Sequence, residues 1–187
     1  TDILISHMLG PQEVTSYNIL FRYFSVIPML FTILITPMWS ASTEAYVHKD
    51  FAWIEKSMEK IKKLLFMSWG LVIIMILFSN VAYRLWVGNE FNISYLASLL
   101  MGVYVCVITW SSSYSSFLNG FGKLNLQIIN TVFAAILFIP IAYLLGKYWG
   151  IEGVIVALIF VNISGAFLNT FQFKRIVKGE ATGIWNK

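Results

Sequence analysis

The residues with the clearest potential for chemistry share one face of an apolar segment near the start of the chain. Arg22 lies within the segment 14–38, and Asn18 and Ser25 stand four residues before it and three after it, which places all three on one side of a helix. Arg22 follows Val14 by eight residues, or about 12 Å of helix rise. At that depth in a membrane an arginine costs at least about 2.5–3.5 kcal/mol. The pattern predicts either an arginine that reaches the interface or pairs with another helix, or a cation facing a water-filled cavity.

A second polar face occurs in the segment 93–118. Thr109 and Ser112 stand three residues apart, and Ser116 and Asn119 continue the same face. Serine and threonine hydroxyls can bond to the carbonyl one turn earlier, and small residues let helices approach closely. Taken by itself, this face favours helix packing over ligand binding.

The sequence offers no group of residues suited to catalysis or to holding a metal or cofactor. It has one cysteine, Cys106, and two histidines, His7 and His48, with no metal-ligand spacing. The segment Gly120–Lys123 lacks the residue spacing and the hydroxyl of a phosphate-binding loop. No pair of carboxylates falls inside the apolar segments. We therefore expect no enzyme activity, no catalytic residue, no metal site and no cofactor.

The composition identifies the setting in which these residues must work. Of the 187 residues, 58% are hydrophobic and 12% are charged, against about 45–50% and about 25% in soluble domains. These proportions exclude a soluble enzyme and a disordered chain. Spanning helices need about 20 mostly apolar residues, and the sequence predicts an all-α membrane bundle of about six helices. The expected helices are a truncated one at 1–10 and spanning ones at 14–38, 64–86, 93–118, 126–145 and 153–173.

The basic residues predict the orientation of these helices. Ten of the thirteen lysines and arginines fall in the connections 39–63 and 119–125 or after residue 173, which alternating spans place on one side. By the positive-inside rule that side is cytoplasmic, and so is the C-terminus. The net charge of +4 is thereby explained by membrane topology, and no nucleic-acid partner is expected.

The connection 50–63 carries an apolar stripe on an otherwise charged segment. Ile54, Met58 and Ile61 recur at three- and four-residue spacing, and Asp50 can cap the start of a helix. This pattern predicts an amphipathic helix that lies at the cytoplasmic membrane interface and leads into the spanning helix 64–86.

Four short segments together resemble the bacterial polysaccharide flippases, the O-antigen translocases of the multidrug/oligosaccharidyl-lipid/polysaccharide exporter superfamily. The segment 36–53 resembles the cytoplasmic end of the family's eighth helix. The other matching segments are Asn119–Lys123 with Gln127, Gly150–Val154 and the ending Gly183–Lys187. Their order and membrane side agree with the topology above.

The resemblance implies that this chain is the C-terminal six-helix lobe of a MATE-like exporter fold, with the N-terminal lobe absent from it. The implied substrate is a polyprenyl-diphosphate-linked oligosaccharide, an O-antigen or capsule repeat unit, flipped across the bacterial inner membrane by alternating access. The family's cavity is lined by helices that correspond to 1–10, 14–38 and 93–118 here. The implied substrate-binding residues are Arg22, Asn18, Ser25, Thr109 and Ser112. The implied partners are membrane lipids, the N-terminal lobe and other polysaccharide-assembly proteins.

Three other functions remain open from the residues. A drug or cation antiporter of the same superfamily needs an intramembrane acid, and only Asp2 and Glu13 lie near the first helices. A membrane-embedded glycosyltransferase or polymerase needs a long outer loop with acids or bases, which the spacing does not leave. A non-catalytic membrane scaffold could bind partners through 50–63, but it leaves the polar faces of 14–38 and 93–118 without a role.

Overall fold

The computed structural model describes residues 1–88 and 93–186, and this part of the chain is helical with no strand. The expected all-α membrane bundle is confirmed. The elements are α1 (Asp2–Leu9), α2 (Pro11–Val47), α3 (Phe51–Val87), α4 (Tyr95–Gly120), α5 (Asn125–Val177) and the short 3₁₀ helix η1 (Gly183–Asn186).

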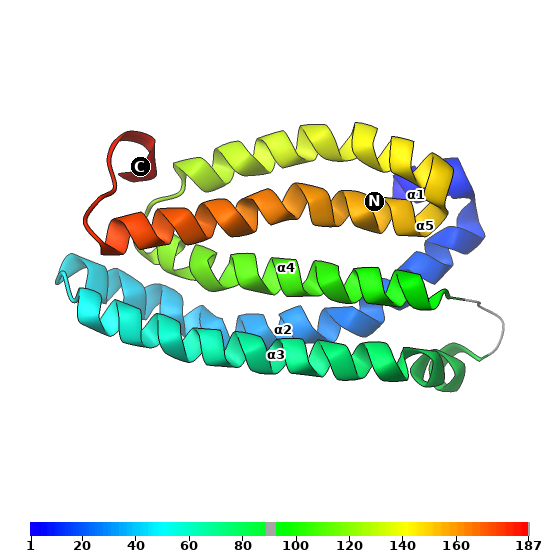
Figure 1. Cartoon of the computed structure of the whole chain (residues 1–187), viewed down its shortest axis with the longest axis horizontal. Helices are drawn as coiled ribbons and strands as arrows, with labels where there is room; N and C mark the ends of the chain where they lie inside the picture. Colours follow the sequence, from blue (N-terminus) through cyan, green and yellow to red (C-terminus); the bar gives the residue numbers. More distant parts are fainter. Residues whose placement is uncertain (89–92, 187) are drawn as a thin grey trace.

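The long helix α5 consists of two arms that fold back on each other (Figure 1). The break is Gly150, whose φ of 61° lies in the left-handed region that glycine adopts without strain. A Cβ at Gly153 would overlap the backbone of Leu145, so glycine is also needed where the second arm leaves the turn. The carboxylate of Glu152 accepts a hydrogen bond from the Ser94 hydroxyl, which ties this turn to the start of α4. The arms contain the two helices expected at 126–145 and 153–173.

Helix α4 occupies the middle of the bundle and contacts α2, α3 and α5 (Figure 1). Short α1 packs against α2 and α5. The α2–α3 turn, the α4–α5 connection and the C-terminus lie together at one end of the bundle, which we call the basic end. The predicted cluster of cations is found there, except Lys187, which lies outside the described residues. Its members are Lys49, Lys56, Lys60, Lys62, Lys63, Lys123, Lys174, Arg175 and Lys178.

The helices α2 and α3 are longer than the apolar segments that predicted them. Helix α2 continues past residue 38 to Val47 through a stretch in which Ala41, Glu44 and Ala45 favour a helix while the serines, Thr43 and Glu44 lower the hydropathy. The hydropathy of the sequence therefore locates the apolar part of each helix but does not predict the residue at which the helix begins or ends.

The segment 50–63 continues without a break into the apolar segment 64–86, and its apolar stripe faces the bundle. It is the first part of α3, and Asp50 caps it by accepting a hydrogen bond from the Trp53 backbone nitrogen at 2.9 Å. Ile54 and Met58 are at most 2% exposed and pack in a cluster with aromatic residues of α4 and α5. Because the bundle itself covers the apolar stripe, the stripe does not need the membrane interface as a partner.

Four helices, α2 to α5, are long and apolar enough to cross a membrane. Between residues 66 and 78 the outward face of α3 is apolar: Ile73, Leu77 and Phe78 are 58–64% exposed. Exposed apolar faces on long helices are stable in lipid and not in water. The chain is thus part of a multi-pass membrane protein.

The segments that resemble the flippases at 36–53 and 119–123 pack together at the basic end. The Cβ of any larger residue at Gly120 would lie 2.7 Å from the Trp39 carbonyl oxygen, so the end of α4 approaches α2 closely. One residue further on, Phe121 stacks on Tyr46 with ring centroids 4.6 Å apart. The glycine and the aromatic residue of the 119–123 segment therefore serve helix packing.

Candidate functional site

Three of the predicted site residues lie together on the outward face of α2, which we call the α2 polar stripe (Asn18, Arg22 and Ser25). Arg22 is exposed, and Asn18 and Ser25 are half-buried. The opposite side of α2 carries Leu20 and Phe24, which are at most 1% exposed and belong to the bundle core. The helix thus divides into a face that packs and a face that turns away from the bundle.

The α2 polar stripe makes no polar contact with another helix in the described part of the chain. The Asn18 side-chain nitrogen donates to the Val14 carbonyl oxygen at 3.0 Å, and the Ser25 hydroxyl donates to the Arg22 carbonyl oxygen at 2.8 Å. The Arg22 guanidinium has no hydrogen bond or ion pair with any residue that the structure describes. Both donors beside Arg22 are held by their own helix, so the arginine is the group left to meet a ligand or another part of the protein.

The depth of Arg22 follows from its neighbour Tyr23. The Tyr23 hydroxyl donates to the Met75 carbonyl oxygen at 3.1 Å. Met75 is the midpoint of the apolar segment 64–86 that crosses the membrane within α3. This contact puts the Arg22 turn of α2 beside the middle of a spanning segment, which is where a cation is most expensive in lipid.

Thr109 does not join the stripe. It is 1% exposed, and its hydroxyl donates to backbone carbonyls of α4 and accepts from the Trp69 indole nitrogen at 3.3 Å. The Thr109 hydroxyl is enclosed between α3 and α4 in this structure, and its contacts are those of helix packing. Ser112 is half-buried on α4 and is likewise not brought together with Arg22. The sequence pattern missed this because a hydroxyl stripe looks the same whether a helix or a cavity covers it.

A second polar region joins α4 to both arms of α5, and we call it the α4–α5 seam. The Asn169 amide donates to the Ser111 hydroxyl at 3.0 Å, and the Trp110 indole donates to the Thr170 hydroxyl at 3.1 Å. The Ser115 hydroxyl donates to the Gln127 side-chain oxygen at 2.7 Å. Between the two arms of α5, Ser164 donates to Asn130 at 2.9 Å. Most polar side chains in the seam therefore bond to one another, although the buried side-chain nitrogen of Gln127 has no partner among the described residues.

The seam was only partly predicted. In the sequence, Asn162, Gly165, Asn169 and Gln172 share one face of the segment 153–173, a pattern that favours hydrogen bonding between helices, and Asn169 does bond to α4. Asn162 bonds only to the Leu158 carbonyl oxygen of its own helix. The signal that could have found Asn130 is its spacing with Gln127 and Thr131, which places the three polar residues on one face at the start of an otherwise apolar helix.

The described residues contain no group of three His, Cys, Asp or Glu side chains that could hold a metal ion. The chemistry available on the α2 polar stripe is recognition by charge and hydrogen bonds: an exposed guanidinium flanked by an amide and a hydroxyl. A guanidinium binds phosphate and carboxylate oxygens through paired hydrogen bonds.

The fold and this outward polar face define a helical membrane protein of many spans. Comparison with known proteins narrows this broad class. Over 161 residues the chain is 24% identical to a protein named putative O-antigen transporter from Salmonella typhimurium. Over 164 residues it is 25% identical to a protein named putative O-antigen export protein from Yersinia pseudotuberculosis. Each comparison covers 84% of this chain. The resemblance inferred from the motifs is confirmed by both.

The chain spans little more than a third of the curated relatives it matches, 37% of one and 36% of the other. No family model matches the chain. No solved structure matches it. Both relatives are named for transport or export, and neither name describes an enzyme.

Proposed function

We propose that this chain is one lobe of a transporter that flips a polyprenyl-diphosphate-linked oligosaccharide across the bacterial inner membrane. The observation that carries the proposal is Arg22: an exposed guanidinium beside the middle of the apolar segment 64–86, with no partner among the described residues. The names of the two relatives indicate polysaccharide export as the process.

Arg22 is suited to the charged part of such a substrate. The diphosphate offers several anionic oxygens, and a guanidinium holds two of them at once in fixed geometry. Asn18 and Ser25 lie one turn away on the same face. Beyond the bonds to their own helix, the second amide N–H of Asn18 can donate to the diphosphate, and the side-chain oxygens of both residues can accept from the first sugar. The substrate anion in turn offsets the free energy of keeping a cation at membrane depth.

The stripe lies on the outside of this bundle, so a cavity around it requires another wall. In the proposed transporter that wall is an N-terminal lobe, which the relatives have the length to contain. Alternating access then comes from rocking one lobe against the other around the fixed arginine. The driving energy is an ion gradient or the flux of substrate itself.

The proposed orientation puts the basic end in the cytoplasm. Nine described cations gather there, whereas Arg84 and Lys147 lie at the opposite end. The positive-inside rule makes the C-terminus cytoplasmic, and the substrate would move from the inner to the outer leaflet.

The test is replacement of Arg22 in the natural protein, in cells that need it for surface polysaccharide. Losing one charge-assisted contact of about 1.5–3 kcal/mol lowers export at least about tenfold in Arg22→Ala. Arg22→Lys retains the charge but not the fork, so we expect partial export. Arg84→Ala removes an exposed arginine from the end of α3 and serves as the matched control.

Export is measured as surface polymer, with lipid-linked sugar in the inner leaflet as the second readout. Accumulation of lipid-linked sugar in Arg22→Ala, at equal expression, supports a failed flipping step. Unchanged export in Arg22→Ala removes the proposed role, and equal loss in Arg84→Ala shows that the effect is not specific to the stripe.

A further inference from the structure

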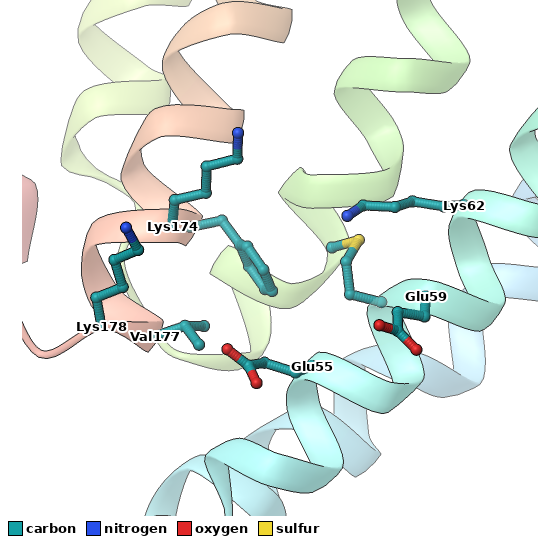
Figure 2. A pocket seen from close by; sticks show the side chains of 8 residues that line it. Glu55, Glu59, Lys62, Lys174, Val177 and Lys178 are labelled. Atoms are coloured by element: carbon teal, nitrogen blue, oxygen red, sulfur yellow. The ribbon is translucent and has the colours of Figure 1, made fainter.

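A charged cleft lies between α3 and the second arm of α5 at the basic end, and it contains none of the residues assigned to substrate binding. Its volume is about 290 Å³, and an apolar floor is formed by Met58, Phe173 and Val177. Figure 2 shows the cleft between the two helices. Its charged lining residues are Glu55, Glu59, Lys62, Lys174 and Lys178.

The two walls of the cleft differ in charge, because α3 carries both glutamates and one lysine whereas α5 carries two lysines. Glu55 and Glu59 lie one turn apart on α3, and Lys174 and Lys178 lie one turn apart on α5 (Figure 2). Lys62, which is half-buried, projects from the α3 wall toward α5. Among the residues that the structure describes, no ammonium nitrogen lies within 4.0 Å of a carboxylate oxygen across the cleft. The two walls therefore stand open to a ligand that carries both signs of charge.

The cleft lies where both of its helices change from charged to apolar sequence. On α3, Lys62 and Lys63 directly precede the apolar segment 64–86. On α5, Lys174 directly follows the apolar segment 153–173. In a membrane this boundary is the level of the phospholipid headgroups, with the acyl chains running along the exposed apolar faces beyond it.

We propose that this cleft binds the headgroup of an aminophospholipid of the phosphatidylethanolamine type. The phosphate contacts Lys174, Lys178 and Lys62, and the primary ammonium donates hydrogen bonds to Glu55 and Glu59. A volume of about 290 Å³ stands at the lower end of ligand sites, which hold about 300–1,000 Å³, so it suits a headgroup and not an oligosaccharide. This inference is independent of the flippase proposal.

The chemistry of the two walls discriminates among lipids. An anionic headgroup such as phosphatidylglycerol leaves Glu55 and Glu59 without a counter-charge and next to its own negative charge. A choline headgroup has the right charges, but its quaternary nitrogen has no N–H to donate to the carboxylates. Phosphatidylethanolamine satisfies both walls.

The experiment measures binding of three lipids to the purified natural protein by native mass spectrometry, with acyl chains matched among phosphatidylethanolamine, phosphatidylglycerol and phosphatidylcholine. We expect phosphatidylethanolamine to bind at least about fivefold more tightly than the other two. The double variant Glu55→Gln/Glu59→Gln should abolish that preference, and Lys174→Gln/Lys178→Gln should weaken phosphatidylethanolamine binding itself. Lys56→Gln/Lys60→Gln changes two exposed lysines of α3 that do not line the cleft and is the matched control.

The outcomes separate the proposal from its rivals. Equal binding of the three lipids, or a preference that survives both cleft variants, overturns it. Tightest binding of phosphatidylglycerol with sensitivity only to the lysines indicates a general anionic-lipid site, which also overturns it. Glycerophosphoethanolamine, which has the same headgroup without acyl chains, is added as a competitor at the concentration of the lipid. If it displaces phosphatidylethanolamine, the cleft binds a soluble compound and not a lipid.

Discussion

The α2 polar stripe and the α4–α5 seam are built from the same kinds of residue at the same helical spacing, yet they differ in what they face. In the seam, Asn169 and Ser111 bond across two helices. In the stripe, Asn18 and Ser25 bond only to carbonyls of their own helix, and Arg22 is exposed beside them. Apart from the Gln127 side-chain nitrogen, the buried polar groups of the seam are paired among the described residues. The stripe, by contrast, has an exposed charge left for something outside it.

The comparison teaches how polar residues in a membrane protein divide between stability and function. Hydrogen bonds across helices hold the bundle together with modest free energy, about 0.6 kcal/mol on average. An unpaired arginine contributes nothing to the packing of this bundle and is expensive in lipid. Substitutions in the seam should therefore change stability, and those in the stripe should change transport.

The largest expected effect on stability is at Gly165 in the seam. A Cβ there would lie 3.0 Å from the Asn130 side-chain nitrogen and 3.7 Å from the Ser111 hydroxyl. The bulk of Gly165→Leu forces α4 and the arms of α5 apart, and we expect a loss of about 1–3 kcal/mol. Thermal unfolding of the purified protein in detergent measures it.

Gly70→Leu is the control for that substitution. Gly70 lies in α3 with no atom within 4 Å of its Cβ position, so the same added volume extends outward. Its unfolding temperature should stay near that of the unmodified protein. If both leucine variants lose the same stability, close packing at the seam is not the cause.

An intermediate effect is expected from exchanging one asparagine in each region. Asn169→Leu removes the bond to Ser111 and should lower the free energy of unfolding by about 0.6–1.7 kcal/mol. Asn18→Leu breaks only a bond to its own helix, so unfolding should hardly change while export falls. A double-mutant cycle with Ser111→Ala isolates the interhelical term. A coupling energy of zero there would contradict the seam as a stabilising contact.

The smallest effects are expected from removing single hydroxyl groups. Ser25→Ala should alter stability by no more than about 0.5 kcal/mol and lower export less than Arg22→Ala does, because a neutral hydrogen bond contributes about 0.5–1.5 kcal/mol. Ser164→Ala, which loses the bond to Asn130, is the counterpart in the seam and should lower stability but leave export unchanged. Unfolding and export are measured for both variants. If Ser25→Ala lowers stability but not export, and Ser164→Ala lowers export but not stability, the assignment of the stripe to transport and of the seam to stability is wrong.

The sequence alone determined the class of the molecule and its helical segments. The excess of apolar residues over charged ones required a membrane, and runs of about 20 apolar residues required helices, because a spanning backbone must satisfy its own hydrogen bonds. It also marked Arg22, since a cation in such a run is conspicuous without any structure. Gly150 and Gly153 stood out as part of a motif, and the hairpin of α5 supplies their physical reason.

Only the tertiary structure decided which polar face is covered. Thr109 and Arg22 both belong to polar stripes, but α3 encloses Thr109 and no described helix covers Arg22. The apolar face of the segment 50–63 was ambiguous in the same way, because it could face the membrane surface or other helices. In the structure it packs against the bundle. Periodicity reports that a helix has two different faces, but the neighbour of each face is set by how the helices pack, and that information lies in contacts between residues far apart in the sequence.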